Sequence, residues 1–419
     1  MIVINGSYGE GGGQVLRTSL TLSALLGEPV RIENIRAKRR KPGLQAQHLT
    51  GVRAIAEICD AELEGAHLGS LALTFRPLSS PRAGEYSFDV AKARKGGSAG
   101  ATSLVFQTLL LPLAFAPGQS RLTIRGGTHV AWSPAFHYLK YVYLPTLAHT
   151  GLEARVEIER WGWYPIGGGE MTALIKGQGF LLPASPFSKR EFSRKGVAAQ
   201  PSWASFGPRR PMRLACYPLD KADVRLSERS QRNQGEEGKE RESRESYLPG
   251  LDLVGRGELR RLWGISATSN LPPHISQRQK KRAEEYLQRY GFDPQIEIVD
   301  APSPGQGTIV FLVSEYEHTV AGFSSFGKRG KPAEKVAEET CREFIEYHQS
   351  GACLDKHLAD QLILPMALAF GPSVFSTCEI TMHLLTNVWV VEQFLDLRFE
   401  IKGEEGQRGN VQKRASESS

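Results

Sequence analysis

Apolar positions along this chain follow two periods, one typical of strands and one typical of helices. Residues 2–4 form a short apolar run, which predicts a strand. Leu16, Leu20 and Ala24 recur at helical spacing and predict a helix over residues 14–26 that ends at Gly27. The pattern continues with a predicted strand over 30–35, a helix over 44–60 and a strand over 71–75.

A similar order of elements returns twice at roughly hundred-residue spacing, which indicates an internal repeat. The second unit has predicted strands over 85–90, 121–124, 152–158 and 170–175, helices over 104–111 and 134–149, and a glycine turn over 96–100. The third has predicted strands over 319–323 and 397–401 and helices over 332–348, 355–369 and 383–395. We therefore predict an α/β fold built from repeated units.

The pattern changes between residues 184 and 312, which we expect to form a smaller inserted domain. Residues 1–183 would then hold the first two units and residues 313–402 the third. The insert has predicted strands over 259–268, 295–299 and 308–313 and a basic amphipathic helix over 275–290. Segment 225–245 has no aromatic residue and almost balanced charge, so we expect it to be disordered, and we expect the same of the tail over 403–419.

Composition agrees with a protein of several lobes. A chain of 419 residues, 40% of them hydrophobic, exceeds what one core normally supports. The formal charge of +7 permits nucleic-acid binding without requiring it. The five cysteines include no Cys-x-x-Cys pair, which argues against a disulfide framework or a structural zinc site. With no signal peptide and no apolar run of spanning length, we expect an intracellular protein that has no membrane partner.

A glycine-rich segment over residues 9–13 separates the first predicted strand from the first predicted helix. Such a turn at a helix N-terminus lets backbone N–H groups approach an anion closely. Glu10 lies inside the turn, and Arg17 follows one helical turn later. The segment lacks the Gly-Lys-Ser/Thr of a P-loop and is not a clean dinucleotide fingerprint. On this evidence alone, a tight strand-to-helix turn explains it equally well.

A cluster of cations over residues 36–41 raises the case for a phosphate-rich ligand. Five of its six residues are Arg or Lys, and it stands between the predicted strand over 30–35 and the helix that starts near Leu44. Such a cluster is usually a solvated loop, but Arg and Lys also supply most phosphate contacts to nucleic acids. Two potential anion sites so close in sequence favour a polyanion.

Six segments, taken together, resemble the RNA 3′-terminal phosphate cyclases. They occur in the family's order and are residues 9–14, 36–48 with their Lys-Pro-Gly-Leu core, 97–100 with Gln107, 163–169, 358–362 and 383–387. The resemblance spans residues 1–402 and is weak only between about 180 and 310. It implies three repeats of two helices and a four-stranded sheet in a large domain, with a thioredoxin-like inserted small domain.

The resemblance also implies an ATP-dependent ligase that acts on RNA with a 3′-phosphate end. His383 matches the family's nucleophile, although a lone histidine is more often structural and ten compete in this chain. A neutral imidazole suits the role because it is nucleophilic near pH 7. The implied route passes through a covalent histidyl-AMP and an RNA-(3′)pp(5′)A end to a 2′,3′-cyclic phosphodiester.

The family's ATP-binding positions are carried over residue by residue. Glu10 matches a carboxylate suited to holding Mg²⁺ or Mn²⁺ beside the triphosphate. His357 stands where relatives often have Tyr, and Asp360 and Gln361 also read as the polar start of an apolar run. The full ATP-binding set comprises Glu10, Arg17, Arg36, Arg39, Gln47, His48, Gln107, His357, Leu358, Ala359, Asp360 and Gln361.

Two other functions share this fold. A cyclase-like family acts in ribosome biogenesis without catalysis and lacks the nucleophilic histidine, so His383 argues against it. The enolpyruvyl transferases share the repeat but lack the Lys-Pro-Gly-Leu and His-Leu-Leu-Thr-Asn segments present here. The resemblance places a eukaryotic protein of this kind in the nucleus and any other in the cytoplasm, and the sequence leaves the oligomeric state open.

Overall fold

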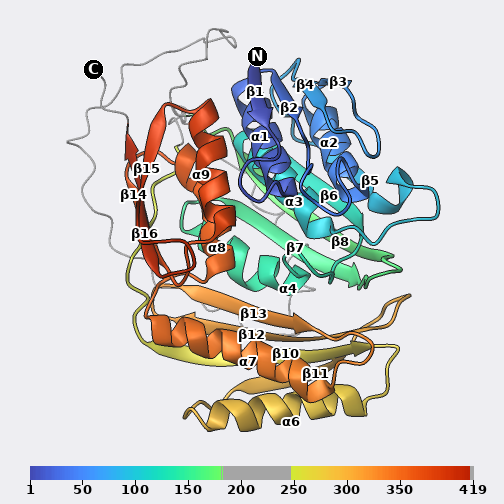
Figure 1. Cartoon of the computed structure of the whole chain (residues 1–419), viewed down its shortest axis with the longest axis vertical. Coiled ribbons are helices and arrows are strands. Elements are labelled where there is room, and N and C mark those ends of the chain that lie inside the picture. The colour runs from blue at the N-terminus through green and yellow to red at the C-terminus, as the bar shows by residue number, and fades with distance from the viewer. Residues whose placement is uncertain (181, 183–246, 416–419) are drawn as a thin grey trace, which may run out of the picture.

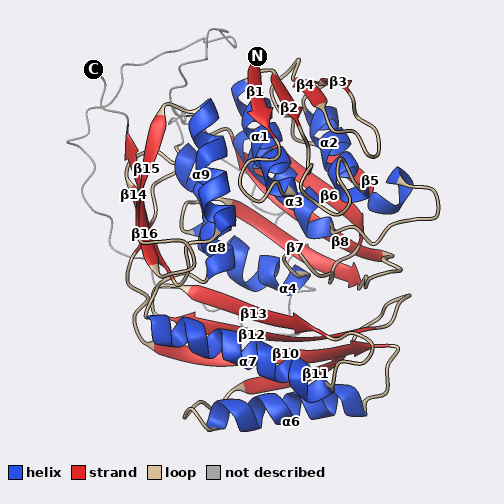
Figure 2. Cartoon of the chain, in the orientation of Figure 1, coloured by secondary structure: helices blue, strands red, loops and turns tan. Residues whose placement is uncertain are grey.

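The computed structural model describes residues 1–180, 182 and 247–415, which form a large domain of three sheets and a small domain of one sheet (Figure 1). Segment 225–245, for which the sequence predicts disorder, lies outside the described residues. No helix in the described part combines the length and the apolar character needed to cross a membrane. Helices and strands are mixed in both domains (Figure 2), so the predicted α/β class is confirmed.

The first unit contains two helices and a four-stranded sheet. Its elements are β1 (Ile2–Asn5), α1 (Gly13–Leu26), β2 (Val30–Glu33), α2 (Ala46–Ile58), β3 (Glu62–Glu64) and β4 (Leu73–Arg76). The strand order is β1-β2-β4-β3, with β1 parallel to β2 and the other pairs antiparallel. Gly27 ends α1 in the left-handed conformation, at φ 68°, as the sequence predicted.

The second unit repeats this plan. Its strands are β5 (Glu85–Asp89), β6 (Pro117–Gly126), β7 (Glu153–Arg160) and β8 (Gly169–Gln178), in the order β5-β6-β8-β7. Its first helix is α3 (Thr102–Phe115). The second is irregular, because a π-helical turn (Leu139–Tyr143) separates α4 (Phe136–Tyr138) from α5 (Leu144–Ala148).

The third unit has the same topology but is interrupted. Its elements are β9 (Asp252–Leu253), α8 (Lys356–Leu368), β14 (Ser373–Thr377), α9 (Met382–Phe394), β15 (Leu397–Lys402) and β16 (Gly409–Ala415). The strand order is β9-β14-β16-β15, again with the first pair parallel and the others antiparallel. In every unit the fourth strand therefore lies between the second and the third, which confirms the repeat.

The small domain is one sheet covered by two helices on one face. It comprises β10 (Leu259–Ser269), α6 (His274–Gln288), β11 (Gln295–Asp300), β12 (Gly307–Tyr316), β13 (Val320–Phe326) and α7 (Ala333–Ser350), with strand order β11-β10-β12-β13. Val310 and Leu312 of β12 pack with the helices, whereas Phe311 and Val313 belong to the core shared with the large domain. Both faces of this sheet are thus buried, and the two domains share an apolar interface.

The boundaries of the insert differ from the prediction. The segments over 319–323 and 332–348, predicted to open the third unit, are β13 and α7 of the small domain. Conversely, β9 lies within the predicted insert but pairs with β14 of the third unit. The small domain therefore interrupts the third unit between its first strand and its first helix. Apolar periodicity identifies an element but not the sheet that it joins, because pairing partners are distant in sequence.

The predicted disorder of the tail is wrong for residues 403–415. Strand β16 lies between β14 and β15, so its backbone is paired on both sides. Its polar composition concealed it: Val411 is fully buried, and buried Lys413 donates a hydrogen bond to the carbonyl oxygen of Ala369. Backbone pairing on both sides thus adds to the burial of Val411 in holding this strand in place.

Candidate active site

An open cleft of about 3350 Å³ runs between the large and small domains. Its lining includes eleven of the residues predicted from the sequence: Glu10, Arg17, Arg36, Arg39, Gln47, His48, Gln107, His357, Asp360, Gln361 and His383. Leu358 and Ala359 are fully buried in the hydrophobic core, so their side chains do not line it. The fold therefore gathers residues of the first, second and third units at one place.

His383 is the second residue of α9, close to that helix's N-terminus. The side chain of Thr381 caps the helix by accepting a hydrogen bond from the backbone N–H of Leu384 at 3.0 Å. The Nδ1 atom of His383 lies 3.0 Å from Oε1 of Glu10. A carboxylate accepts from Nδ1–H, which leaves Nε2 with its lone pair unprotonated and free to attack.

The surroundings of His383 favour its neutral form. Burial lowers its pKa below the usual value, and the positive charges of Arg17 and Arg39 add to the lowering, although Glu10 opposes it. The side chain remains 44% exposed, so a ligand in the cleft has access to the ring. An accessible neutral imidazole whose tautomer is set by a carboxylate is suited to nucleophilic attack.

The glycine-rich loop of the first unit packs against α9. Gly9 adopts φ +56°, and a Cβ atom there would lie 2.2 Å from Oγ1 of Thr386, so glycine is required for the close approach. The rings of Tyr8 and Trp389 stack with centroids 3.9 Å apart. The amide of Gln14 also donates to the backbone carbonyl of His383 at 2.8 Å. These contacts hold Glu10 against His383.

The predicted arginines have different roles. Nη2 of Arg39 bonds Oε2 of Glu10 at 2.7 Å. Arg36 donates to the carbonyl oxygens of Lys41 and Gly43, at 2.7 and 2.9 Å, so it shapes the cationic loop. Arg17 makes no ion pair in the described part of the chain, and burial lowers its pKa to about 10. A cation kept partly buried without a partner is suited to receiving an anion.

His48 is neutral and fixed in orientation. Burial, together with the charges of Arg36 and Arg17, lowers its pKa to about 3. Its Nδ1 accepts from the backbone N–H of Gln45 at 3.1 Å, so the ring proton resides on Nε2. A Cβ atom on Gly13 would lie 2.4 Å from that Nε2. The ring therefore sits against the glycine turn and has a donor there.

The start of α8 contributes the polar wall of the cleft. Gln107 and Gln361 are joined by a side-chain hydrogen bond between α3 and α8. Asp360 accepts a hydrogen bond from the hydroxyl of Thr381. Burial raises the pKa of Asp360 to about 7, although that hydrogen bond opposes the rise. Gln47 accepts from the backbone N–H of Ala101 at 3.0 Å and so contacts the glycine turn of the second unit.

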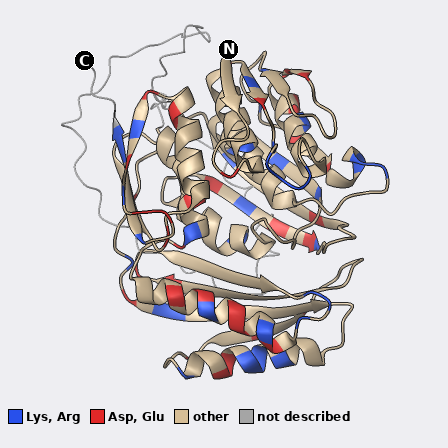
Figure 3. Ribbon diagram, in the orientation of Figure 1, with Lys and Arg blue, Asp and Glu red and all other residues tan. Residues whose placement is uncertain are grey.

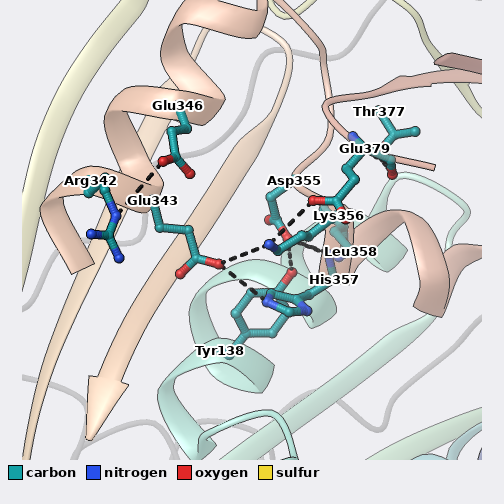
Figure 4. A network of polar contacts seen from close by, with 10 residues as sticks. All are labelled: Tyr138, Arg342, Glu343, Glu346, Asp355, Lys356, His357, Leu358, Thr377 and Glu379. Carbon is teal, nitrogen blue, oxygen red and sulfur yellow. Dashed lines mark hydrogen bonds and ion pairs between the residues drawn. The ribbon is translucent and has the colours of Figure 1, made fainter. Parts of the chain in front are cut away.

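A network of polar contacts that the sequence did not reveal holds the N-terminus of α8 in place (Figure 4). Buried Asp355 caps α8 by accepting from the backbone N–H groups of His357 and Leu358, both at 3.0 Å. It also accepts from the hydroxyl of Tyr138 at 2.7 Å. Aspartate at the start of a helix is an N-cap signal, and Asp355 opens the helix predicted over 355–369, so this role was detectable in the sequence; the contact with Tyr138 was not.

Glu343 connects the small domain to this wall. From α7 it approaches Nε2 of His357 at 3.5 Å and Nζ of Lys356 at 3.8 Å (Figure 4). Burial alone would lower the pKa of His357, but its contact with Glu343 and the charge of Asp355 raise it above the usual value. No local pattern distinguishes Glu343 from other surface carboxylates on α7.

The residues of the cleft could hold a divalent metal only if water and phosphate oxygens of a bound nucleotide supplied most of its ligands. In the described part of the chain no group of three or more His, Cys, Asp and Glu side chains could hold an ion. Both oxygens of Glu10 already have partners, Arg39 and His383. Mg²⁺ often binds one or two carboxylates and takes its other ligands from water and phosphate oxygens. Glu10 fits that single-carboxylate role.

Comparison with known proteins shows the family to which the chain belongs. The family model described as RNA 3′-terminal phosphate cyclase matches residues 8–401. The chain belongs to this family. A protein of Nostoc punctiforme named RNA 3′-terminal phosphate cyclase is 42% identical over 94% of both chains. One of the same name from Methylococcus capsulatus is 42% identical over 96% of this chain and 93% of its own.

The similarity extends to archaeal relatives. A Methanopyrus kandleri protein with that name is 36% identical over 99% of both chains. The relatives are thus bacterial and archaeal, and the nuclear location that the sequence suggested for a eukaryotic protein has no support. The cyclase family that was recognised from the sequence is confirmed.

Proposed function

We propose that this chain uses ATP to convert an RNA 3′-terminal phosphate into a 2′,3′-cyclic phosphodiester. The observation that carries the proposal is the pairing of His383 with Glu10 in a cation-lined cleft, at 3.0 Å. The names of the relatives supply the substrate class. We assign the reaction to the cytoplasm.

In the first proposed step, Nε2 of His383 attacks the α-phosphorus of ATP. An N–P bond forms and the bond to pyrophosphate breaks, which yields a covalent histidyl-AMP. Arg17 and Arg39 flank His383 closely enough to influence its charge state, and cations there would balance the charge that develops on the phosphates. The Nε2–H of His48 is a further donor at the glycine turn.

In the second step, an oxygen of the RNA 3′-phosphate attacks the AMP phosphorus and displaces His383. In the third, the neighbouring ribose 2′-OH attacks the 3′-phosphorus, loses its proton and expels AMP, which closes the cyclic phosphodiester. Mg²⁺ or Mn²⁺ bound at Glu10 and the triphosphate would neutralise charge and align the leaving group. Gln107, His357, Asp360 and Gln361 would hold the nucleotide.

Labelling with α-³²P-ATP and divalent metal tests the proposal. The wild-type protein should acquire a label that is acid-labile and base-stable on a denaturing gel, and His383→Ala should acquire none while retaining the wild-type circular dichroism spectrum. The labelled protein should then convert a 3′-phosphorylated oligoribonucleotide to its cyclic form. Absence of label on the wild type under varied metal conditions would point to the non-catalytic cyclase-like function.

A further inference from the structure

Two aromatic rings are exposed in the cleft that contains His383. The side chain of Trp132 is 99% exposed and that of Tyr164 is 77% exposed, and both line the cleft. Large aromatic side chains usually gain their stabilisation from burial. Neither ring contributes to the described hydrophobic core, so folding does not account for them.

The loop that presents Trp132 is held in an unfavourable backbone conformation. Trp132 adopts φ +67°, a region that bulky side chains rarely enter. Val130 and Ala135 on either side are buried, and the hydroxyl of Ser133 donates to the carbonyl oxygen of Val130 at 2.9 Å. The surrounding structure thus imposes the conformation. Strain of this kind concentrates at functional sites.

Tyr164 stands on a turn anchored to both domains. Its neighbour Trp163 is buried and lies beside Gly307 of the small domain. The backbone N–H of Gly167 donates to the carbonyl oxygen of Trp163 at 2.7 Å, which closes the turn. Pro304 of the small domain packs against Gly168. The backbone that carries Tyr164 is therefore fixed relative to the cleft.

Two basic loops line the same cleft, and within the described structure they have no carboxylate partners. Lys38, Arg40 and Lys41 follow β2, and Lys328 and Arg329 follow β13. Figure 3 shows both loops in the colour of Lys and Arg, whereas α6 and α7 mix the two signs of charge. None of the five forms an ion pair among residues 1–180, 182 and 247–415.

The cations of α6 contrast with those of the two loops. Arg278 and Arg282 on α6 are each paired with a glutamate of α7, at 2.7 Å. These two cations of the helix are thus balanced by carboxylates, whereas the five loop cations at the cleft form no ion pair in the described part of the chain.

We propose that Trp132 and Tyr164 form a stacking platform for the single-stranded RNA that carries the 3′-phosphate, with the two basic loops holding its backbone. The inference rests on the proposed function and adds to it the path of the RNA. A strand whose end reaches His383 must leave through this open cleft. Aromatic rings beside unpaired cations are the means by which proteins hold single strands with little sequence preference.

The cations exceed what a nucleoside triphosphate requires. Arg17 and Arg39 already lie near His383, and the five loop cations are additional to these two. They come from two domains, so they are spread along the cleft. A single nucleotide would leave most of them unpaired, whereas a strand of several nucleotides has a phosphate for each.

Steady-state kinetics separates RNA binding from the chemistry on ATP. Trp132→Ala and Tyr164→Ala should acquire label from α-³²P-ATP at the wild-type rate in the absence of RNA. Their KM for a 3′-phosphorylated oligoribonucleotide should rise roughly 5- to 100-fold, as expected for the loss of one base stack. Trp132→Phe should restore most of the affinity. The matched control is Tyr290→Ala, whose ring is 49% exposed but lies outside the cleft.

Substrates with abasic sites identify stacking itself. For the wild-type protein, removing one base near the 3′ end of the RNA should lower the affinity as much as Trp132→Ala lowers the affinity for the intact strand. For Trp132→Ala, removing that base should lower the affinity little further. An unchanged KM for RNA in both alanine variants, or additive effects of variant and abasic site, would overturn the platform.

The salt dependence of RNA binding tests the role of the two basic loops. Replacing Lys328 and Arg329 together with alanine should reduce the salt dependence of RNA binding, and the slope should fall by about 0.7 for each phosphate that is no longer neutralised. Lys281→Ala is the control, because that side chain is 79% exposed on α6 and outside the cleft.

If the wild type fails to cyclise RNA, the proposed function fails. Trp132 fluorescence, taken as wild type minus Trp132→Phe, then decides the inference: absence of quenching by the same oligonucleotide overturns it.

Discussion

Oε1 of Glu10 lies 3.0 Å from Nδ1 of His383, although 373 positions separate the two residues in sequence. Glu10 belongs to the glycine turn of the first unit and His383 to the first turn of α9 in the third. The contact joins the first and third units of the repeat and leaves Nε2 of the imidazole without its proton. The most direct predictions concern this pair.

Glu10→Gln should slow self-adenylation by about 10- to 100-fold, the loss known for removing a carboxylate that orients a metal-binding histidine, because Glu10 orients His383 in the same way. The amide loses the negative charge that favours Nδ1–H and that pairs with Arg39. The measurement is the single-turnover rate of labelling by α-³²P-ATP. Glu33→Gln, at an exposed ion pair with Arg31, is the control. An unchanged rate in Glu10→Gln would refute its orienting role.

The pH profile of adenylation follows from the lowered pKa of His383. The rate should be level around neutral pH, where the imidazole is unprotonated, and should fall only below pH 6.5 as the ring gains its proton. Because Glu10 raises this pKa, Glu10→Gln should move the acid limb to lower pH while lowering the plateau. Movement of the limb to higher pH would contradict the assignment of charges around His383.

Gly13→Ala should impair the site through a steric effect. The added methyl group would lie 2.4 Å from Nε2 of His48, and overpacking of this kind costs about 1–3 kcal/mol. We expect a lower melting temperature and at least about a 10-fold loss of adenylation. Gly255→Ala is the control, since a methyl group there has no neighbour within 4 Å. Equal behaviour of the two variants would show that His48 moves aside without consequence.

Asp355→Ala should destabilise the protein by about 2–4 kcal/mol. It removes the cap of α8, worth about 1–2 kcal/mol, and leaves the buried hydroxyl of Tyr138 without its acceptor. Since α8 carries His357 and Asp360, KM for ATP should rise as well. Tyr138→Phe leaves the cap intact and should cost only about 1 kcal/mol. Urea denaturation and ATP titration measure the two effects, and a larger loss in Tyr138→Phe would contradict this division.

Local signals predicted the elements well and their assembly less well. The helix ending at Gly27 and the helix over 275–290 could be read from apolar spacing and end signals, because both depend on neighbours within a few residues. The strand over 409–415 was missed because backbone pairing with β14 and β15 holds it, and its composition is polar. The border of the small domain was misplaced for the same reason: β13 is defined by its pairing with β12.

Some features of the candidate site could likewise be predicted from the sequence, and others are visible only in the structure. Motifs in the sequence were sufficient to name the family and to single out His383, Glu10 and the glycine turn. The different roles of Arg36 and Arg17 were not visible there, since one donates to loop carbonyls and the other has no ion pair in the described structure. Glu343 and Tyr138 carried no signal, because their importance lies in partners on other elements.

The sequence by itself determined the family and which candidate residues have side chains suited to the proposed nucleotidyl transfer, because motif spacing and side-chain type are local properties of the chain. Only the tertiary structure decided which of them act together. It set Glu10 against His383, left Trp132 and Tyr164 exposed in the same cleft, and placed five cations there that form no ion pair with any described residue. Hydrogen bonds, burial and charge depend on distances in space, and the packing of three units and an inserted domain sets those distances.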